Sequence, residues 1–441
     1  MTFTELLPAY MFLVFTVLIL IGYPIAFTIA GTALAFGLYA FGLDFFNLLP
    51  LRVWGVMTNF TLTAVPLFVF MGVTLERSGL AEDLLETMGF VFGRIPGGIA
   101  IAVVVVGTLL AASTGIVGAT VTTMGLIALP TMLRRGYQKE LVTGVICASG
   151  TLGQIIPPSI VLVIVADILQ ISVGDIFLGA FIPGLILSGL YVLYVTGVCL
   201  FAPHLAPAIP PSERAEVSTR ELTMRVSRVM VPPLALMTAV LGSIFFGIAS
   251  PTEAAAVGAT GALALTVVNR RFKMKMLRET MQVTVRLTSM VFIILVGATA
   301  FGLAFRGMGG DALVRNFIAD LQVPPMAVFG GVMVLVFVLG FFLDFIEISF
   351  IHLPVLAPIL TEMGFDPVWY GVVLGVNLQT SFLTPPFGYA LFYLRGVAPA
   401  DVTTGHIYRG ILPFVAIQLI GMLAVILFPA LALWLPNLVF Q

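Results

Sequence analysis

The chain reads Gly153-Gln154-Ile155-Ile156-Pro157-Pro158-Ser159 inside one long apolar stretch and Gln379-Thr380-Ser381-Phe382-Leu383-Thr384-Pro385-Pro386 inside another. Two consecutive prolines remove backbone donors and disrupt a helix. Irregular backbone within a bilayer is tolerated only where protein or a water-filled cavity satisfies its polar groups. Each stretch therefore predicts a transmembrane helix that is broken in the middle, over residues 139–166 and 366–394.

The two breaks belong to an internal repeat. Residues 79–158 match residues 307–386 at a constant spacing, so that Gly79 pairs with Gly307, Pro96 with Pro324, Pro130 with Pro358 and Pro157-Pro158 with Pro385-Pro386. A weaker match joins residues 24–31 to 251–258, so the repeat includes most of the chain. Repeats with a broken hydrophobic segment at the same place in each half are typical of secondary transporters.

Composition agrees with a membrane protein. Of the 441 residues, 60% are hydrophobic and 9% are charged, and the mean hydropathy is +1.14. These values exclude a soluble globular chain, and most of the apolar stretches reach the ~20 residues that a membrane helix needs. The alternating pattern of an outer-membrane barrel is absent, and a net charge of −1 argues against a nucleic-acid partner. We expect an all-α, multi-pass membrane protein.

The distribution of basic residues predicts the orientation. All 20 Lys and Arg residues can lie on one side of the membrane except Arg52, Arg306 and Arg315. The positive-inside rule makes the rich side cytoplasmic and places both termini on the external side. Arg94 and Arg134 flank the apolar stretch 96–133 and both belong on the cytoplasmic side, so this stretch is expected to enter the membrane and return as a hairpin.

The second half contains the equivalent stretch 324–362, with its middle at Leu343-Asp344-Phe345-Ile346-Glu347-Ile348-Ser349. Because each half has an odd number of crossings, this second hairpin would enter from outside. We therefore predict two inverted repeats, residues 1–202 and 229–441, each with scaffold helices, a re-entrant hairpin and a broken helix. Residues 203–228 would form a cytoplasmic linker that ends in an interfacial helix at 218–228 or in a solvated segment.

The breaks predict binding chemistry without many formal charges. A half-helix that starts after Pro157-Pro158 or Pro385-Pro386 points free N–H groups at the break, which favours an anion. The preceding half-helix presents free carbonyls, which with Ser, Thr, Asn and Gln oxygens favour Na⁺. Asp344 and Glu347 lie at the second hairpin tip, where a carboxylate is a functional candidate. Asp344 is interpreted as a cation ligand or proton-sensitive group, with a structural hydrogen bond as its alternative.

At these residues the chain resembles the large membrane subunit of tripartite ATP-independent periplasmic (TRAP) transporters. The resemblance covers essentially the whole chain and rests also on Leu75-Glu76-Arg77-Ser78-Gly79-Leu80, on Phe342-Leu343-Asp344 and on Leu353-Pro354-x-Leu356-x-Pro358. It implies a sodium-driven importer of organic acids in the bacterial inner membrane, with both termini in the periplasm and an elevator-type transport domain. It also implies two partners, a small four-helix membrane subunit and a periplasmic substrate-binding protein.

The resemblance also implies site residues. Ser113 and Thr114 at the first tip would join Gly150, Thr151, Gly153 and Gln154 of the first break in one Na⁺ site. Asp344 would join Gln379, Thr380 and Ser381 in another. The substrate would approach Thr114, Ser159 and Asp344. The stretch 344–349, with its added glutamate, looks like a sub-branch that includes transporters of 2-oxo acids and similar monocarboxylates, while a dicarboxylate or sugar acid stays open.

Two other functions fit part of the sequence pattern. A stand-alone Na⁺-coupled dicarboxylate symporter would share the hairpin plan. An intramembrane enzyme would need Asp344, Glu347 and His352 as a catalytic set, but the chain shows no paired-aspartate, Ser-His or metal-ligand spacing that supports one. We therefore expect a transporter subunit and not an enzyme, with Na⁺ as the coupling ion.

Overall fold

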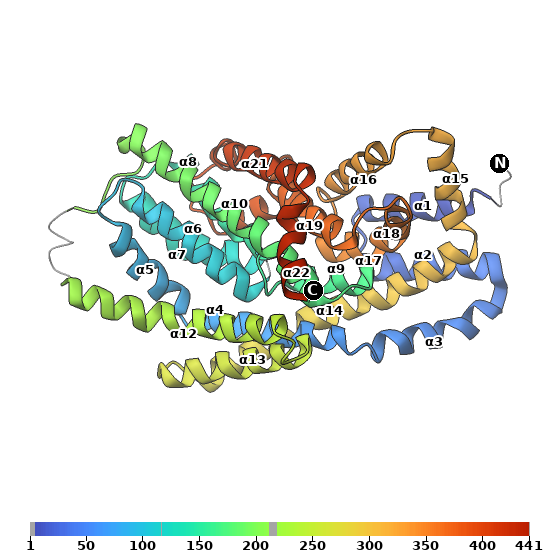
Figure 1. Ribbon diagram of the computed structural model, residues 1–441, viewed down its shortest axis with the longest axis horizontal. Helices are drawn as coiled ribbons and strands as arrows, with labels where there is room; N and C mark the ends of the chain where they lie inside the picture. Colours follow the sequence, from blue (N-terminus) through green and yellow to red (C-terminus); the bar gives the residue numbers. More distant parts are fainter. Residues whose placement is uncertain (1–4, 116, 211–217, 441) are drawn as a thin grey trace.

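The computed structural model describes residues 5–115, 117–210 and 218–440, and of residues 111–114, 219 and 440 it describes the backbone alone. These residues form helices and connecting turns, with no β-strand among them (Figure 1). Seven of the helices are long and apolar enough to cross a membrane, and two bent helix pairs raise that number to nine if each pair is one span. The predicted all-α membrane fold is confirmed.

The first half runs to the end of α10. Its helices are α1 (Leu7–Ile21), α2 (Ile25–Phe41), α3 (Phe45–Met57), α4 (Ala64–Arg77), α5 (Leu80–Phe92), α6 (Gly98–Thr114), α7 (Val117–Arg134), α8 (Lys139–Thr151), α9 (Ile160–Leu169) and α10 (Val173–Phe201), with short 3-10 turns η1 (Gly42–Asp44), η2 (Thr61–Thr63) and η3 (Leu152–Gln154). The pair α6 and α7 is the predicted first hairpin, and its turn includes Gly115 at a φ of +60°. The predicted first broken helix is α8, η3 and α9.

The second half follows the 3-10 turn η4 (Pro203–Leu205). Its helices are α12 (Thr219–Phe245), α13 (Pro251–Val268), α14 (Met274–Gly307), α15 (Gly310–Leu321), α16 (Pro325–Leu339), α17 (Phe345–Ile351), α18 (Leu353–Glu362), α19 (Pro367–Leu383), α20 (Tyr389–Val397), α21 (Thr404–Leu427) and α22 (Ala430–Phe440). The second hairpin is α16 with α17 and α18, and its returning arm bends by 58°. The second broken helix is α19 and α20.

Local sequence explains where the second-half helices begin. Asp366 precedes Pro367, the first residue of α19, and its carboxylate accepts hydrogen bonds from the N–H groups of Val368 and Trp369. An N-cap oxygen followed by proline at the first helical position is a favoured start. Ser250 and Glu253 form a capping box at α13 in the same way. These caps fix where α13 and α19 begin, and α19 leads into the second predicted break.

Corresponding helices of the two halves make corresponding contacts across the molecule. The N-terminal helix α2 packs against α14, and its repeat equivalent α13 packs against α4. The helix after each break packs against the hairpin of the other half, α9 on α17 and α18, and α20 on α7. In addition α8 packs on α21 and α19 on α10. These reciprocal contacts agree with a two-fold relation between the halves. The opposite orientation of the two halves in the membrane stays a prediction.

The linker region differs from expectation at one point. The predicted interfacial helix at 218–228 is not a separate element, because α12 continues without a break from Thr219 to Phe245. Its first turns lie beside α5, where Arg225 is 4.0 Å from Glu86. The start of α12 and the end of α10 lie at one end of the long axis, and the N-terminus and α15 lie at the other (Figure 1).

Candidate functional site: two breaks and two hairpin tips

The first break is fully buried and polar. Thr151 ends α8, and its hydroxyl donates to the Ala148 carbonyl at 2.9 Å. Gly153 and Gln154 lie in the 3-10 turn that follows, and Gln154 is 0% exposed, with neither side-chain amide atom hydrogen-bonded. A buried carboxamide without partners is costly to leave unsatisfied. Gln154 is therefore free to hold a ligand at this break.

Ser159 connects the break to α9. It is the residue before α9, and its hydroxyl donates to the Gln154 carbonyl at 2.8 Å instead of capping the helix. The first-turn N–H groups of α9 thus lack a side-chain cap from Ser159, as expected for an anion-binding helix start. Gly115 lies against this turn, since a Cβ on Gly115 would be 3.1 Å from the Ile160 nitrogen.

The first hairpin packs tightly against the first break. A Cβ on Gly150 would overlap the Val121 side chain and would lie 3.3 Å from the Val121 nitrogen on α7. The structure therefore places Gly150, Thr151, Gly153, Gln154 and the turn at Gly115 together. The side chains of Ser113 and Thr114, which were predicted to complete this site, lie outside the described residues.

The second break is built from buried amides and hydroxyls. The Asn377 side chain donates to the Met333 carbonyl at 2.8 Å, and the Ser381 hydroxyl donates to the Phe337 carbonyl at 2.8 Å. Both acceptors belong to α16, so these bonds fix α19 to the second hairpin. The Thr380 hydroxyl bonds within its own helix, to the Val376 carbonyl. Gln379 instead reaches the other half, because its Nε2 lies 3.4 Å from the Thr151 hydroxyl.

The two tip carboxylates form a capping box at α17. Asp344 is the N-cap, and its Oδ1 accepts from the Phe345 N–H at 2.7 Å, while Glu347 accepts from the Asp344 N–H at 2.8 Å. Asp344 is half-buried and Glu347 is 8% exposed. The Asp344 side chain makes no hydrogen bond to Gln379, Thr380 or Ser381 within the described part of the chain. The predicted grouping of these four residues stays a prediction.

Two tyrosines on α20, which the sequence did not single out, connect the hairpin tips. The Tyr389 hydroxyl donates to the Phe342 carbonyl at 2.9 Å, just before Asp344. A Cβ on Gly118 of α7 would lie 2.6 Å from Cζ of the Tyr393 ring, so Tyr393 packs directly against α7 at this glycine. The helix after the second break therefore lies beside both tips.

The donor set fits a small hard cation. The first break offers the amide oxygen of Gln154 and the hydroxyl of Thr151, and the second offers Gln379 with an unpartnered Oε1. Neutral oxygens and one carboxylate suit a monovalent ion, and the described residues contain no His, Cys, Asp and Glu group that would suit a transition metal. The oxygen ligands present therefore fit a small monovalent cation such as Na⁺.

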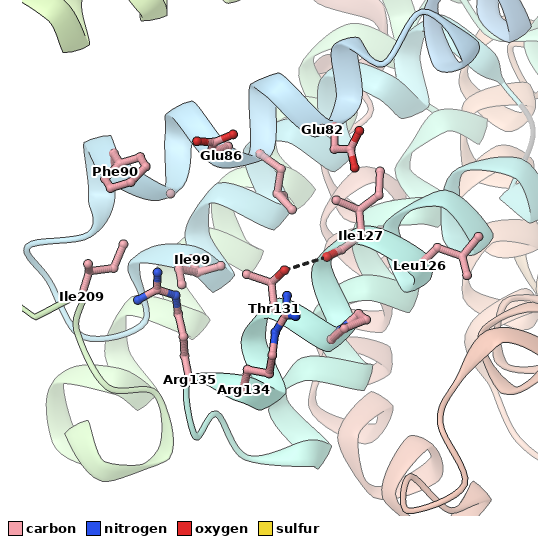
Figure 2. A pocket seen from close by; sticks show the side chains of 13 residues that line it. Glu82, Glu86, Phe90, Ile99, Leu126, Ile127, Thr131, Arg134, Arg135 and Ile209 are labelled. Atoms are coloured by element: carbon pink, nitrogen blue, oxygen red, sulfur yellow. Dashed lines mark hydrogen bonds between the residues drawn. The ribbon is translucent and has the colours of Figure 1, made fainter. Parts of the chain in front are cut away.

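A separate cavity of about 340 Å³ lies at the base of the first hairpin, between α5 and α7. Figure 2 shows Glu82 and Glu86 on α5 and Arg134 and Arg135 at the end of α7 around it. This cavity lies at the opposite end of α7 from the tip. It separates the hairpin base from α5 and is not the predicted site.

Comparisons with known proteins identify the family. The family described as "Tripartite ATP-independent periplasmic transporter, DctM component" matches residues 12–431. The C4-dicarboxylate TRAP transporter large permease protein DctM of Pseudomonas aeruginosa is 32% identical over 408 residues, which cover 92% of this chain and 93% of that protein. The isethionate TRAP transporter permease protein DctMQ of Oleidesulfovibrio alaskensis is 30% identical, over 95% of this chain and 65% of that protein.

A solved structure, that of the YdaH transporter of Alcanivorax borkumensis, has a similar fold, with a TM-score of 0.63 at 16% identity over 89% of this chain and 88% of that one. The family match includes both hairpins and both breaks. The predicted identity is therefore confirmed, and the enzyme alternative is not supported: the chain belongs to the DctM component family of TRAP transporters and is a large permease subunit for organic acid uptake.

Proposed function

We propose that this permease couples the import of small carboxylates to the entry of Na⁺, with one ion site at each break. One observation carries the proposal, namely that each break combines buried, uncharged oxygen ligands with the start of a half-helix. The oxygens suit Na⁺, and the uncapped N–H groups of α9 after Ser159 suit a carboxylate. A secondary transporter can then bind both solutes near one another without a fixed charge for each.

The substrate is proposed to be a 2-oxo or hydroxy monocarboxylate. The relatives' names indicate different anions, a C4-dicarboxylate in one and isethionate, a sulfonate, in the other. An anion is thus common to them, while its shape differs. Ser159, Thr114 and Asp344 are the proposed substrate contacts, and Glu347, which caps α17 through the Asp344 N–H, would fix the tip that carries Asp344.

Two partners are proposed. The chain covers 65% of the relative named DctMQ, and we assign the remainder of such a protein to a small membrane subunit that this chain would bind as a separate polypeptide. A periplasmic binding protein would deliver the acid. Movement of the hairpins and breaks against α2, α4, α13 and α14 would carry the solutes across as an elevator.

The test is uptake into proteoliposomes that contain this chain and the small subunit, with the binding protein outside and an inward Na⁺ gradient. Uptake that needs every component and the gradient is the expected result. Uptake by this chain alone would instead establish a stand-alone symporter, and uptake that is indifferent to Na⁺ would refute the proposed ion coupling.

A further inference from the structure

Four buried polar residues meet where the two halves contact each other. Thr151 and Gln379 are joined by a hydrogen bond although they are 228 residues apart, which is the spacing of the internal repeat. Tyr191 on α10 and Gln418 on α21 follow the two broken helices in the same order, 227 residues apart. All four are 0% exposed. We call this group the axial cluster.

The position of the axial cluster follows from symmetry. Two equivalent residues related by a two-fold axis can touch each other only where they lie near that axis. The bond from Gln379 to Thr151 therefore marks the axis between the halves. The helices that carry the four residues pack accordingly, α8 on α21, α19 on α10, and α10 on α21. Thr151 and Gln379 each belong to a different proposed ion site, so the two sites touch here.

The axial cluster contains polar atoms without regular partners. The Tyr191 hydroxyl interacts with the carboxamides of Gln418 and Gln379 but has no hydrogen bond of ordinary geometry. Gln379 Oε1 and both amide atoms of Gln418 also lack partners. The Tyr191 ring packs edge-on against the Phe414 ring, with a centroid distance of 5.2 Å. The hydroxyl can thus orient either carboxamide, while the Tyr191 ring itself stays fixed.

We infer that Tyr191 and Gln418 are positioning residues that couple the two Na⁺ sites. The inference rests on the proposed function. Thr151 already donates to Ala148, so an ion at the first break and the Nε2 of Gln379 share its remaining lone pairs. An ion that draws on Thr151 reorients the Gln379 carboxamide, and Tyr191 and Gln418 determine where Gln379 Oε1 then points. Binding at one break thereby changes affinity at the other, and such coupling is commonly about 5- to 150-fold.

The experiment measures uptake against Na⁺ concentration for the reconstituted permease with its partners. The unaltered protein is expected to show a Hill coefficient well above one. Tyr191→Phe removes only the hydroxyl, and we expect its Hill coefficient to fall toward one, with half-saturating Na⁺ raised about 5-fold and little change in maximal rate. Gln418→Met, of similar volume, should change the Hill coefficient and the half-saturating Na⁺ concentration in the same direction. It tests the inference independently if the Tyr191→Phe variant fails to fold.

Tyr194→Phe is the matched control. Tyr194 lies one turn further along α10, is half-buried and packs on the same Phe414 ring at 5.1 Å. It should keep the Hill coefficient of the unaltered protein. Folded Tyr191→Phe and Gln418→Met variants that also keep it would overturn this inference alone. Uptake without any Na⁺ dependence in the unaltered protein would overturn the proposed function, and the inference with it.

Discussion

Replacement of Gly150 by alanine tests whether the packing of the first hairpin sets the first ion site. A methyl group there would overlap Val121 Cγ2 and lie 3.3 and 3.4 Å from the Val121 nitrogen and Cα. The side chain of Val121 can rotate, but its backbone can give way only if α7 moves off α8. Overpacking of this kind destabilises by about 1–3 kcal/mol.

Part of that loss is masked, because alanine favours a helix over glycine by up to about 1 kcal/mol. Gly189→Ala on α10 measures this gain alone, since no atom lies within 4 Å of a Cβ at that position. The informative quantity is the difference between the two variants. If this free-energy difference destabilises only the ion-bound state, about 1–3 kcal/mol corresponds to a roughly 5- to 150-fold weaker apparent Na⁺ affinity.

The assay is the half-saturating Na⁺ concentration for uptake, together with the melting temperature in detergent with and without Na⁺. Gly150→Ala should melt lower than Gly189→Ala and should gain less from added Na⁺. Adding Val121→Ala to Gly150→Ala removes the Cγ2 overlap and should recover part of both losses. The reasoning is refuted if Gly150→Ala and Gly189→Ala match in melting temperature and in Na⁺ affinity.

Other predictions concern single side chains. Asp344→Asn keeps an N-cap oxygen, so we expect folded protein with weakened Na⁺-dependent uptake, and an unchanged Na⁺ response would remove Asp344 from the ion site. Glu347→Ala should destabilise by about 1 kcal/mol through loss of the capping box, while Glu347→Gln should keep the melting temperature. Ser159→Ala should reduce uptake more than expression; uptake at the unaltered rate would rule out its substrate role. Lys139, whose Nζ hydrogen-bonds Asp401, lowers the pKa of that exposed carboxyl. The ion pair therefore contributes its full stabilisation at pH values above the ordinary Asp pKa of about 4. This stabilisation is lost as the pH falls through the lower pKa that Asp401 has in the folded state. Asp401→Asn should accordingly shift the melting temperature equally at pH 8 and pH 9, and a shift that differs between them would contradict this.

The hairpins and breaks could be predicted because their signals are local or repeated. Prolines, a fixed repeat spacing and flanking arginines each constrain one segment at a time. The capping box of α17 also had a local signal, an acidic residue followed three positions later by glutamate at 344 and 347. That signal indicates that Glu347 has a structural role as a capping residue. Asp344 has a structural role as the N-cap in addition to its proposed contact with the ion.

The axial cluster could not be predicted in the same way. Tyr191 and Gln418 lie in long apolar helices whose periodicity does not indicate which face meets which neighbour. Only the packing of α10 on α21 and of α19 on α10 brings them to Gln379. The same holds for Asn377, whose partner is a backbone carbonyl at Met333. The one signal for the axial cluster in the sequence is the internal repeat, because residues near a two-fold axis lie close to the equivalent residues of the other half.

A third proline pair shows that two consecutive prolines do not by themselves break a helix in this protein. Pro232 and Pro233 lie inside α12, which continues through them, whereas the chain leaves the helix before Pro157 and Pro385. The four residues before the pair in α12 are Arg-Val-Met-Val, while Gly-Gln-Ile-Ile precede Pro157 and Ser-Phe-Leu-Thr precede Pro385. Small and polar residues lower the preference for helix and supply oxygens that can satisfy a broken backbone. The two breaks thus differ from α12 in having small or uncharged polar residues within four positions of the prolines, and some of these residues are proposed to bind Na⁺.

The exchange of helices between halves gives those broken segments their surroundings. The helix after each break packs against the hairpin of the other half, and Gln379 bonds Thr151 across the axis. Neither half alone would bury its second half-helix against the hairpin that covers it in the whole protein. Because an unsatisfied backbone group in the membrane costs several kcal/mol, an isolated half should not hold its break open. Binding chemistry at each break is therefore a property of the pair, and this is why a change at the axis should reach both ion sites.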